Sequence, residues 1–246
     1  MPTLSVPARV PRTAEGSRMA IPSIDPYELP TSDEIPAARV DWTIDTSRCA
    51  LLIHDMQQYF IDAYRRDAEP LATVVPNIVR LREACLAAGI PVVYTMQPGD
   101  QHPSRRGILA DFWGVGLSTG RDTEVIDELT PGPDDIQVTK WRYSAFQRTD
   151  FRQLLAHNGR DQLIVTGVYA HMGCMLSAAD AFMSDVAPFM ALDATADFSR
   201  DEHLMALQYV AKRVGRVETT DALIESITAS ARRRDRETEE LTASLR

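Results

Sequence analysis

Cysteine pairs and long apolar runs are both missing from this chain of 246 residues. Its three cysteines, Cys49, Cys85 and Cys174, lie far apart and form neither a CxxC pair nor a zinc-binding pattern. This spacing predicts a reduced, cytoplasmic protein without a metal site. No apolar run approaches the roughly 18–20 residues that cross a membrane, and the first residues lack the apolar core of a secretory signal. We therefore predict neither a membrane span nor export.

Positive charge is also scarce. Lysine and arginine number 26 against 35 aspartates and glutamates, which gives a formal net charge of −9. Such a chain is not expected to bind nucleic acid or an anionic membrane, and an anionic substrate would require a locally basic pocket. The motifs GxGxxG, GxSxG and GxxxxGK[ST] are absent as well. Their absence removes the commonest dinucleotide, serine-hydrolase and phosphate-loop interpretations.

What the chain does have is an alternation of apolar strands and amphipathic helices after residue 48. The runs predicted as strands are 49–55, 90–96, 137–139, 163–166, 189–193 and 217–219. The predicted helices are 74–85, 150–157, 174–184, 199–213 and the segment from 221 onward. Repeated strand–helix units predict an α/β fold, in which a doubly wound, mainly parallel sheet carries helices on both faces.

Prolines are concentrated before this region, in residues 1–41. Their density rules out a long helix, so we predict an extended arm, with residues 1–18 disordered and residues 19–42 lying across the domain or a partner subunit. The folded domain is expected at 19–228, and residues 229–246 form a charged tail that ends as a frayed helix. Because such an arm gains order only by packing on another surface, and two-fold dimers are the commonest assembly, we predict a homodimer.

Polar residues lie at or just after the ends of four of the predicted strands. They are Asp55, Gln97, Lys140 and Tyr169, and Arg106 lies in the loop after the second strand. Because the carboxyl ends of parallel strands meet at one edge of a sheet, we expect these side chains to converge on one site. Burial favours the neutral form of a carboxyl group, which makes Asp55 a candidate proton donor. Capping of the following helix is the structural alternative for Asp55.

Lys140 lies within an apolar and aromatic segment, where a cation is costly to bury unless it is paired. It is therefore a cation for a carboxylate substrate or a partner for Asp55, unless its ammonium group reaches solvent. Arg142 is interpreted as structural, and Trp113 either lines a site or packs in the core.

Residues 167–174 are predicted to form a strand-to-helix turn, whose backbone N–H groups can hold an anion or an oxyanion. Cys174 in this turn could be a nucleophile, but a small buried residue is the favoured interpretation. His171 is interpreted as an orienting or packed residue. Strand alternation directs the His54 side chain away from Asp55, so His54 is interpreted as a fold residue.

Several long strings in the chain resemble the isochorismatase family. They are LLIHDMQQYF, YTMQPG, RGILADFWGVGL, TKWRYSAF, QLIVTGVYAHMGCM and ADFSRDEHLMALQYVA, and they fall within residues 19–225. The resemblance implies a parallel sheet with flanking helices and a small anionic, chorismate-derived substrate. It also implies hydrolysis of the enolpyruvyl ether of isochorismate to pyruvate and 2,3-dihydro-2,3-dihydroxybenzoate, without a metal or organic cofactor.

The same resemblance assigns roles to individual residues. The family's acid corresponds to Asp55, and the residues that correspond to its substrate contacts are Gln97, Arg106, Lys140, Tyr169 and Gly173. Hydrolysis of a vinyl ether requires a positioned acid and no covalent nucleophile. We therefore expect Asp55 to donate the proton and Lys140 and Arg106 to bind substrate carboxylates.

Three other functions stay open. Phenazine-type relatives hydrolyse 2-amino-2-deoxyisochorismate to 2,3-dihydro-3-hydroxyanthranilate. The lack of a carrier domain after about residue 228 favours this reaction, whereas the string GCMLSAADAFM is nearer the isochorismate type. Nicotinamidase-like relatives are cysteine hydrolases, but Gly173 falls at their nucleophile position. Cys174 lies one residue later, turned by about 100° on a helix, which disfavours an amidase. A non-catalytic subunit that docks through the arm and the tail is the third alternative.

Overall fold

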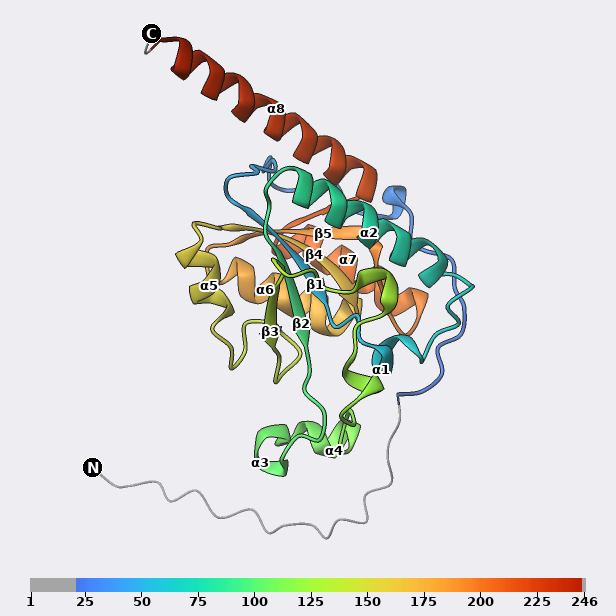
Figure 1. The fold of residues 1–246 in the computed structure, drawn as a ribbon. Coiled ribbons are helices and arrows are strands. Elements are labelled where there is room, and N and C mark those ends of the chain that lie inside the picture. Colours follow the sequence, from blue (N-terminus) through green and yellow to red (C-terminus); the bar gives the residue numbers. More distant parts are fainter. Residues whose placement is uncertain (1–20, 245–246) are drawn as a thin grey trace, which may run out of the picture.

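Six parallel strands form the centre of the molecule, which a computed structural model describes over residues 21–244 (Figure 1). In chain order the strands are β1 (Cys49–His54), β2 (Val92–Met96), β3 (Ile136–Thr139), β4 (Gln162–Val168), β5 (Ala187–Ala196) and β6 (Arg216–Glu218). They are arranged as β3-β2-β1-β4-β5-β6, so the chain winds outward in both directions from the β1–β4 pair. Open α/β sheets bind ligands beyond the carboxyl ends of the strands at such a switch point. The predicted doubly wound sheet is confirmed.

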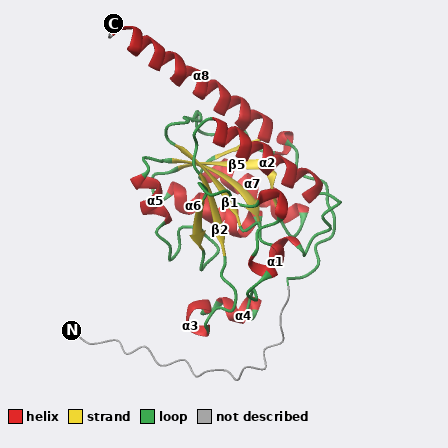
Figure 2. Ribbon diagram, in the orientation of Figure 1, coloured by secondary structure: helices red, strands yellow, loops and turns green. Residues whose placement is uncertain are grey.

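Helices cover both faces of the sheet (Figures 1 and 2). One face carries α2 (Leu71–Ala87) and α8 (Thr220–Ser244), and the other carries α5 (Phe151–His157), α6 (Met175–Phe182) and α7 (Arg200–Arg213). Strand alternation divides β1 between the two cores: Leu51 and Ile53 pack with α2 and α8, and Leu52 packs with α5, α6 and α7. None of the described helices is long and apolar enough to cross a membrane.

Three short helices were not predicted from the sequence, because four or five residues are too few to show a helical period. They are α1 (Gln58–Ile61), α3 (Pro103–Arg106) and α4 (Leu109–Trp113). Gly107 ends α3 with φ 60° and Gly114 ends α4 with φ 58°, a backbone conformation that favours glycine. The chain leaves the carboxyl end of β2 and reaches α3 and α4 at that end of the sheet (Figure 1).

Residues 21–42 of the arm lie across the domain to which they belong. The Ile24 N–H donates to the Ala63 carbonyl at 2.8 Å, Glu34 pairs with Arg200 at 2.6 Å, and Arg216 donates to the Val40 carbonyl at 3.0 Å. The first of the two placements predicted for the arm is therefore the one observed. The prediction for residues 1–18 lies outside the described residues. The predicted charged tail continues α8 as a helix, and its residues 232–243 are exposed.

Candidate active site

A pocket opens at the carboxyl ends of the central strands, with about 530 Å³ of empty space, its mouth included. All six site residues predicted from the sequence line this pocket: Asp55, Gln97, Arg106, Lys140, Tyr169 and Gly173. The remaining lining is largely aromatic and apolar, as is usual for small-molecule sites. The sheet order explains the convergence, since β1, β2, β3 and β4 are neighbours and each contributes a residue that follows its end.

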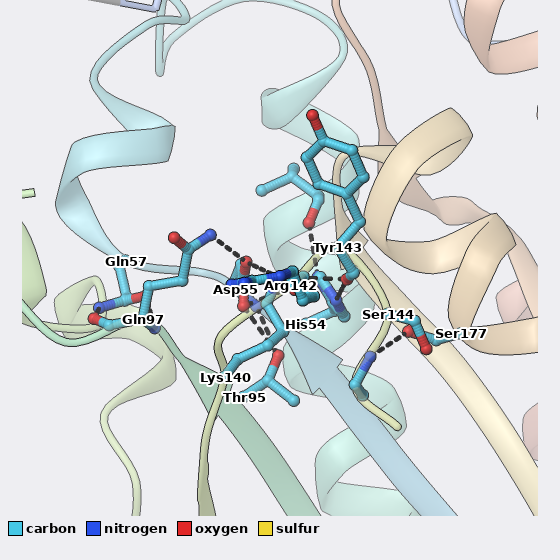
Figure 3. Close-up of polar contacts among 12 residues, drawn as sticks. His54, Asp55, Gln57, Thr95, Gln97, Lys140, Arg142, Tyr143, Ser144 and Ser177 are labelled. Atoms are coloured by element: carbon cyan, nitrogen blue, oxygen red, sulfur yellow. Dashed lines mark hydrogen bonds and ion pairs between the residues drawn. The ribbon is translucent and has the colours of Figure 1, made fainter. Parts of the chain in front are cut away.

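Asp55 lies directly after β1, and its φ of 50° turns the chain out of the strand. One carboxylate oxygen, Oδ2, is 2.7 Å from Lys140 Nζ and accepts a hydrogen bond from Gln97 Nε2 at 3.3 Å. The other, Oδ1, accepts from the Thr95 hydroxyl at 2.8 Å (Figure 3). The residue that precedes α1 is Gln57 and not Asp55, so the capping alternative for Asp55 is wrong. Asp55 is buried, with only 3% of the residue exposed, and its side chain faces the pocket.

Lys140 is the ion-pair partner of Asp55. Its ammonium group also donates to the carbonyl oxygens of Arg142 at 2.8 Å and Tyr143 at 3.1 Å. An ammonium has three N–H donors, so these two carbonyls and Asp55 account for all of them. Of the two roles predicted for a buried Lys140, the structure has the pairing with Asp55. The expectation that Lys140 offers a cation to a substrate carboxylate stays a prediction, and these three contacts leave the ammonium no further donor for it in this geometry.

Arg106 is the cation that the pocket leaves without an acid. Its guanidinium is buried, donates to the Gln97 side-chain oxygen and to the Gly114 carbonyl, both at 3.2 Å, and has no carboxylate at ion-pair distance among residues 21–244. Burial lowers the pKa of Arg106, which expresses the cost of an uncompensated buried charge. A Cβ at Gly116 would lie 2.8 Å from Arg106 Cζ, so glycine there makes room for the guanidinium. This arrangement suits an anionic ligand group.

Aromatic rings form one wall of the pocket. The Tyr169 hydroxyl donates to the Phe60 carbonyl at 3.0 Å, so Tyr169 presents its ring to the pocket. That ring stacks on Phe198 with centroids 4.2 Å apart. Trp113 stacks on the same phenylalanine at 6.0 Å and donates its Nε1–H to the Tyr143 hydroxyl at 2.6 Å. Of the two possibilities left for Trp113, the structure has the pocket wall.

His54 contradicts its sequence-based interpretation. Because the chain turns at Asp55, strand alternation no longer separates the two side chains, and His54 Nδ1 is 3.8 Å from Asp55 Oδ1. The imidazole forms part of the pocket wall, and its nitrogens contact the carbonyl oxygens of Val168 at 2.8 Å and Tyr143 at 3.1 Å (Figure 3). Burial, the largest influence, lowers the pKa of His54.

Gly173 and Cys174 follow β4 in a π-helical turn, Ala170–Cys174. A Cβ at position 173 would lie 2.0 Å from His54 Cε1, so the position cannot hold a side chain unless His54 moves. Cys174 is fully buried, its thiol faces the Thr166 carbonyl at 3.7 Å, and it does not line the pocket. Burial raises the pKa of this thiol well above its usual range, which makes it a poor nucleophile. The interpretation of Cys174 as a buried apolar residue is confirmed.

A second polar cluster lies beside the pocket at the end of β5. One ligand-type atom from each of His171, Asp197 and Glu202 lies within 4.8 Å of the others, a geometry that could hold a metal ion. The Asp197 carboxylate, however, already accepts from the His171 ring at 2.6 Å, the His171 N–H at 2.6 Å and the Phe198 N–H at 2.8 Å. These bonds fix the turn that follows β4. The geometry agrees with the orienting role predicted for His171.

Comparison with known proteins identifies the family of the chain. Residues 49–222 match the isochorismatase domain model. The chain belongs to the isochorismatase family. It is 49% identical over 210 residues to the isochorismatase of Bacillus subtilis strain 168, covering 85% of this chain and 67% of that protein. It is 52% identical over 207 residues to enterobactin synthase component B of Escherichia coli K12, covering 84% and 73%.

Other relatives have different names. The phenazine biosynthesis protein PhzD of Pseudomonas fluorescens is 48% identical over 209 residues, covering 83% of this chain and 98% of that protein. Among solved structures, a cysteine hydrolase from Pseudomonas syringae pv. phaseolicola aligns with a TM-score of 0.72 at 27% identity, covering 79% and 98%. The chain is therefore an enzyme of the isochorismatase-type hydrolase class.

Among the residues that the sequence analysis did not assign to the site, His54, Tyr143 and Phe198 line the pocket, and Thr95 holds Asp55 without lining it. Thr95 could have been found from the sequence. A buried hydroxyl in an otherwise apolar strand needs a hydrogen-bond partner, and the neighbouring strand ends in Asp55. Tyr143 and Phe198 carried no signal beyond their place in the strings that resemble the family, since aromatic residues are more often packed in a core than exposed to a ligand.

Proposed function

We propose that this chain is a vinyl-ether hydrolase that cleaves the enolpyruvyl group of isochorismate, giving pyruvate and 2,3-dihydro-2,3-dihydroxybenzoate. One observation carries the proposal: a buried carboxyl group, Asp55, faces the pocket with its lysine partner, and the nucleophile position beside it is a glycine. The relatives support it, since one of them is named an isochorismatase. Their names also suggest siderophore or phenazine biosynthesis as the setting.

The chemistry follows from these groups. Asp55, in its protonated form, gives its proton to the terminal =CH₂ carbon of the enolpyruvyl group, which becomes a methyl group and leaves an oxocarbenium ion. Water adds to the cationic carbon and returns a proton to Asp55. The resulting hemiketal loses its ring alcohol and becomes pyruvate. Thr95 and Lys140 hold the carboxyl group in place, because each contacts a different carboxylate oxygen.

The pocket has the charge that such a substrate requires. Isochorismate is a dianion, and the guanidinium of Arg106 lacks an acidic partner among the described residues. We assign Arg106 and Gln97 to a substrate carboxylate. We assign the Tyr169 ring and the bare backbone at Gly173 to the faces of the cyclohexadiene.

Hydrolysis of 2-amino-2-deoxyisochorismate is the second candidate. It is supported by the relative PhzD, of which this chain covers 98%. Among the described residues, Asp55 is the only carboxylate that lines the pocket, and it is already paired with Lys140. An ammonium group on the ring would therefore lack an ionic partner. This difference favours isochorismate.

The other two alternatives have less support. A cysteine amidase would need a thiol at the pocket, and Cys174 does not reach it. A non-catalytic docking subunit has no need for a buried acid at the base of a pocket.

Incubation of the purified protein with isochorismate and, separately, with its 2-amino analogue tests the proposal. We expect pyruvate release from both, faster from isochorismate, and unchanged after treatment with a metal chelator because no cofactor is proposed. Release of pyruvate from the 2-amino compound alone would make 2-amino-2-deoxyisochorismate the preferred substrate and reject isochorismate. Absence of pyruvate from both would refute the proposed function.

We further propose that the protein is a cytoplasmic homodimer with a hydrolase domain at 19–228, and that residues 1–18 and 229–246 are dispensable for catalysis. The dimer proposal rests on the commonness of two-fold assemblies and on exposed apolar side chains of α6 and α7, namely Leu176, Met205 and Tyr209. Light scattering should give twice the chain mass of 27.4 kDa at micromolar concentrations. Truncation of each terminal segment should leave pyruvate release intact.

A further inference from the structure

Three arginines outside the pocket lie close together without an acidic partner. Arg105, Arg142 and Arg148 form no ion pair with any carboxylate of residues 21–244, whereas the paired arginines, such as Arg48, Arg66 and Arg216, lie elsewhere on the described chain. The chain has a net charge of −9, so carboxylates are abundant. A group of like charges that stays uncompensated in such a chain is informative, because a single nearby carboxylate would relieve the repulsion.

The three side chains lie near one another beside the pocket wall, and two of them are held in place. Arg142 donates from Nη1 to the carbonyl oxygens of Trp141 at 2.5 Å and Arg105 at 3.2 Å, which ties the segment after β3 to α3. The Arg105 guanidinium lies over the Trp141 ring, 5.5 Å from its centroid. Ser104, Arg105, Trp141 and Arg148 line a mostly polar hollow on the surface.

This hollow and the pocket share a wall. α3 places Arg106 inside the pocket and Arg105 outside it, and the segment after β3 does the same with Tyr143 inside and Trp141 outside. Arg142 lies between the two sides: its charge acts on Arg106 and is itself acted on by Arg148. Cations therefore lie on both sides of this wall, with Arg105 and Arg148 exposed outside it and Arg106 buried inside it.

We propose that Arg105 and Arg148, with Trp141 as an apolar floor, form an outer anion station that captures a small dicarboxylate before it enters the pocket. The proposal rests on the proposed function only for the identity of that dicarboxylate. A ring bearing carboxylates fits the combination of an indole face, two guanidinium groups and the Ser104 hydroxyl. Charges lined up toward a pocket increase the rate at which an oppositely charged ligand arrives, by about 10- to 10³-fold in favourable cases.

Association kinetics test the station directly. In an Asp55→Asn background, which slows turnover, stopped-flow quenching of tryptophan fluorescence follows isochorismate binding, since Trp113 lines the pocket. A second probe, isophthalate, is a dicarboxylate without an ether. We expect Arg105→Gln/Arg148→Gln to lower the association rate constant about tenfold at 10–20 mM salt, with little change in the dissociation rate constant. The difference should vanish near 0.5 M salt, where charges are screened within a few ångströms.

A matched control removes the same charge elsewhere. Arg232→Gln/Arg236→Gln lies on the exposed part of α8 and should leave association unchanged. The outer anion station would be overturned if this control lowered the association rate constant as much as Arg105→Gln/Arg148→Gln does. It would also be overturned if Arg105→Gln/Arg148→Gln left the association rate constant unchanged, and the hollow would then be assigned to another ligand, such as an acidic protein. Failure of both probes to bind would also overturn it. Rim-dependent binding of isophthalate without pyruvate release from isochorismate would keep the station and reject the proposed function.

Discussion

Two buried aspartates, Asp55 and Asp197, follow strands at the same edge of the sheet, yet their surroundings differ in kind. Asp55 is held by side chains, those of Lys140, Thr95 and Gln97, and faces the pocket. Asp197 accepts from two backbone N–H groups and one ring and does not line the pocket. Backbone donors cannot turn away, so they hold the Asp197 carboxylate in one place as part of the fold. Side-chain donors can rearrange, which leaves Asp55 available to a substrate.

The largest expected effect separates the two aspartates by activity. Asp55→Asn should lower the turnover number by about 10²–10⁴-fold, because the amide keeps the shape but cannot donate the proton. It also leaves the buried ammonium of Lys140 without its carboxylate, so the melting temperature should fall as well, but the protein that remains folded should still lack turnover. Asp197→Asn is the matched comparison and should instead lower the free energy of unfolding by about 1–3 kcal/mol, since it weakens a buried network. Pyruvate release and thermal unfolding measure the two. Turnover of Asp55→Asn within threefold of the wild type would remove Asp55 from the mechanism.

Lys140→Ala should have the next largest effect. It leaves a buried carboxylate without its cation, a change that commonly costs about 3–5 kcal/mol, so both stability and turnover should fall. Lys140→Arg should not restore turnover fully, because a planar guanidinium cannot direct its donors to Asp55 and to the carbonyls of Arg142 and Tyr143 as an ammonium does. Steady-state kinetics check both variants. Wild-type constants for Lys140→Ala would show that the pair has no role in the reaction.

Variants at Gly173 and Cys174 test whether the chain works like the cysteine hydrolases. Gly173→Cys places a side chain against the His54 ring and should destabilise the protein by about 1–3 kcal/mol, with a loss of activity that His54→Ala partly relieves. Cys174→Ala removes a buried thiol outside the pocket and should keep most of the activity. A folded but inactive Cys174→Ala protein would reopen the covalent mechanism.

The sequence predicted which strand-end residues meet at the site better than it predicted how those residues contact one another and His54. Asp55, Gln97, Lys140 and Tyr169 were found because strand ends in a parallel sheet share one edge, a rule that needs only element order. His54 was misjudged because the left-handed backbone at Asp55 is a local turn that alternation does not describe. The pairing of Lys140 with Asp55 could not be chosen over substrate binding, since it depends on ångström distances between separate strands.

The fold too was predicted where a long sequence pattern exists and missed where the structure is short and local. Strands and long helices follow hydrophobic period, and all were located within a few residues. β5 proved longer than predicted, reaching Ala196, because Asp193 and Thr195 interrupt the apolar pattern but bond to Thr220 and to the Ala191 carbonyl. The helices α3 and α4, which bring Arg106 and Trp113 to the pocket, are too short for any period to reveal.

The smallest expected effect is a pH dependence of stability in the Asp197 cluster. Burial alone would lower the pKa of His171, but the hydrogen bond and charge of Asp197 outweigh it, so the pKa of His171 is raised above its usual 6.5. A raised value means that the folded state binds the proton more tightly than the unfolded state. The stabilisation from this pair is therefore complete below about pH 6.5 and is lost as the pH rises through the higher value of the folded protein.

His171→Gln removes that titration, so the difference in unfolding free energy between wild type and variant should be larger at pH 6 than at pH 9. His203 provides the opposite sign: burial lowers its pKa to about 3, and its two nitrogens face the hydroxyls of Tyr27 and Thr195, which suit a neutral ring. Its contribution is lost as the pH falls below about 6.5, because the unfolded state then binds the proton. Urea unfolding of wild type, His171→Gln and His203→Gln at pH 5, 6 and 9 should give differences of opposite slope, and parallel slopes would contradict the ion pair at His171.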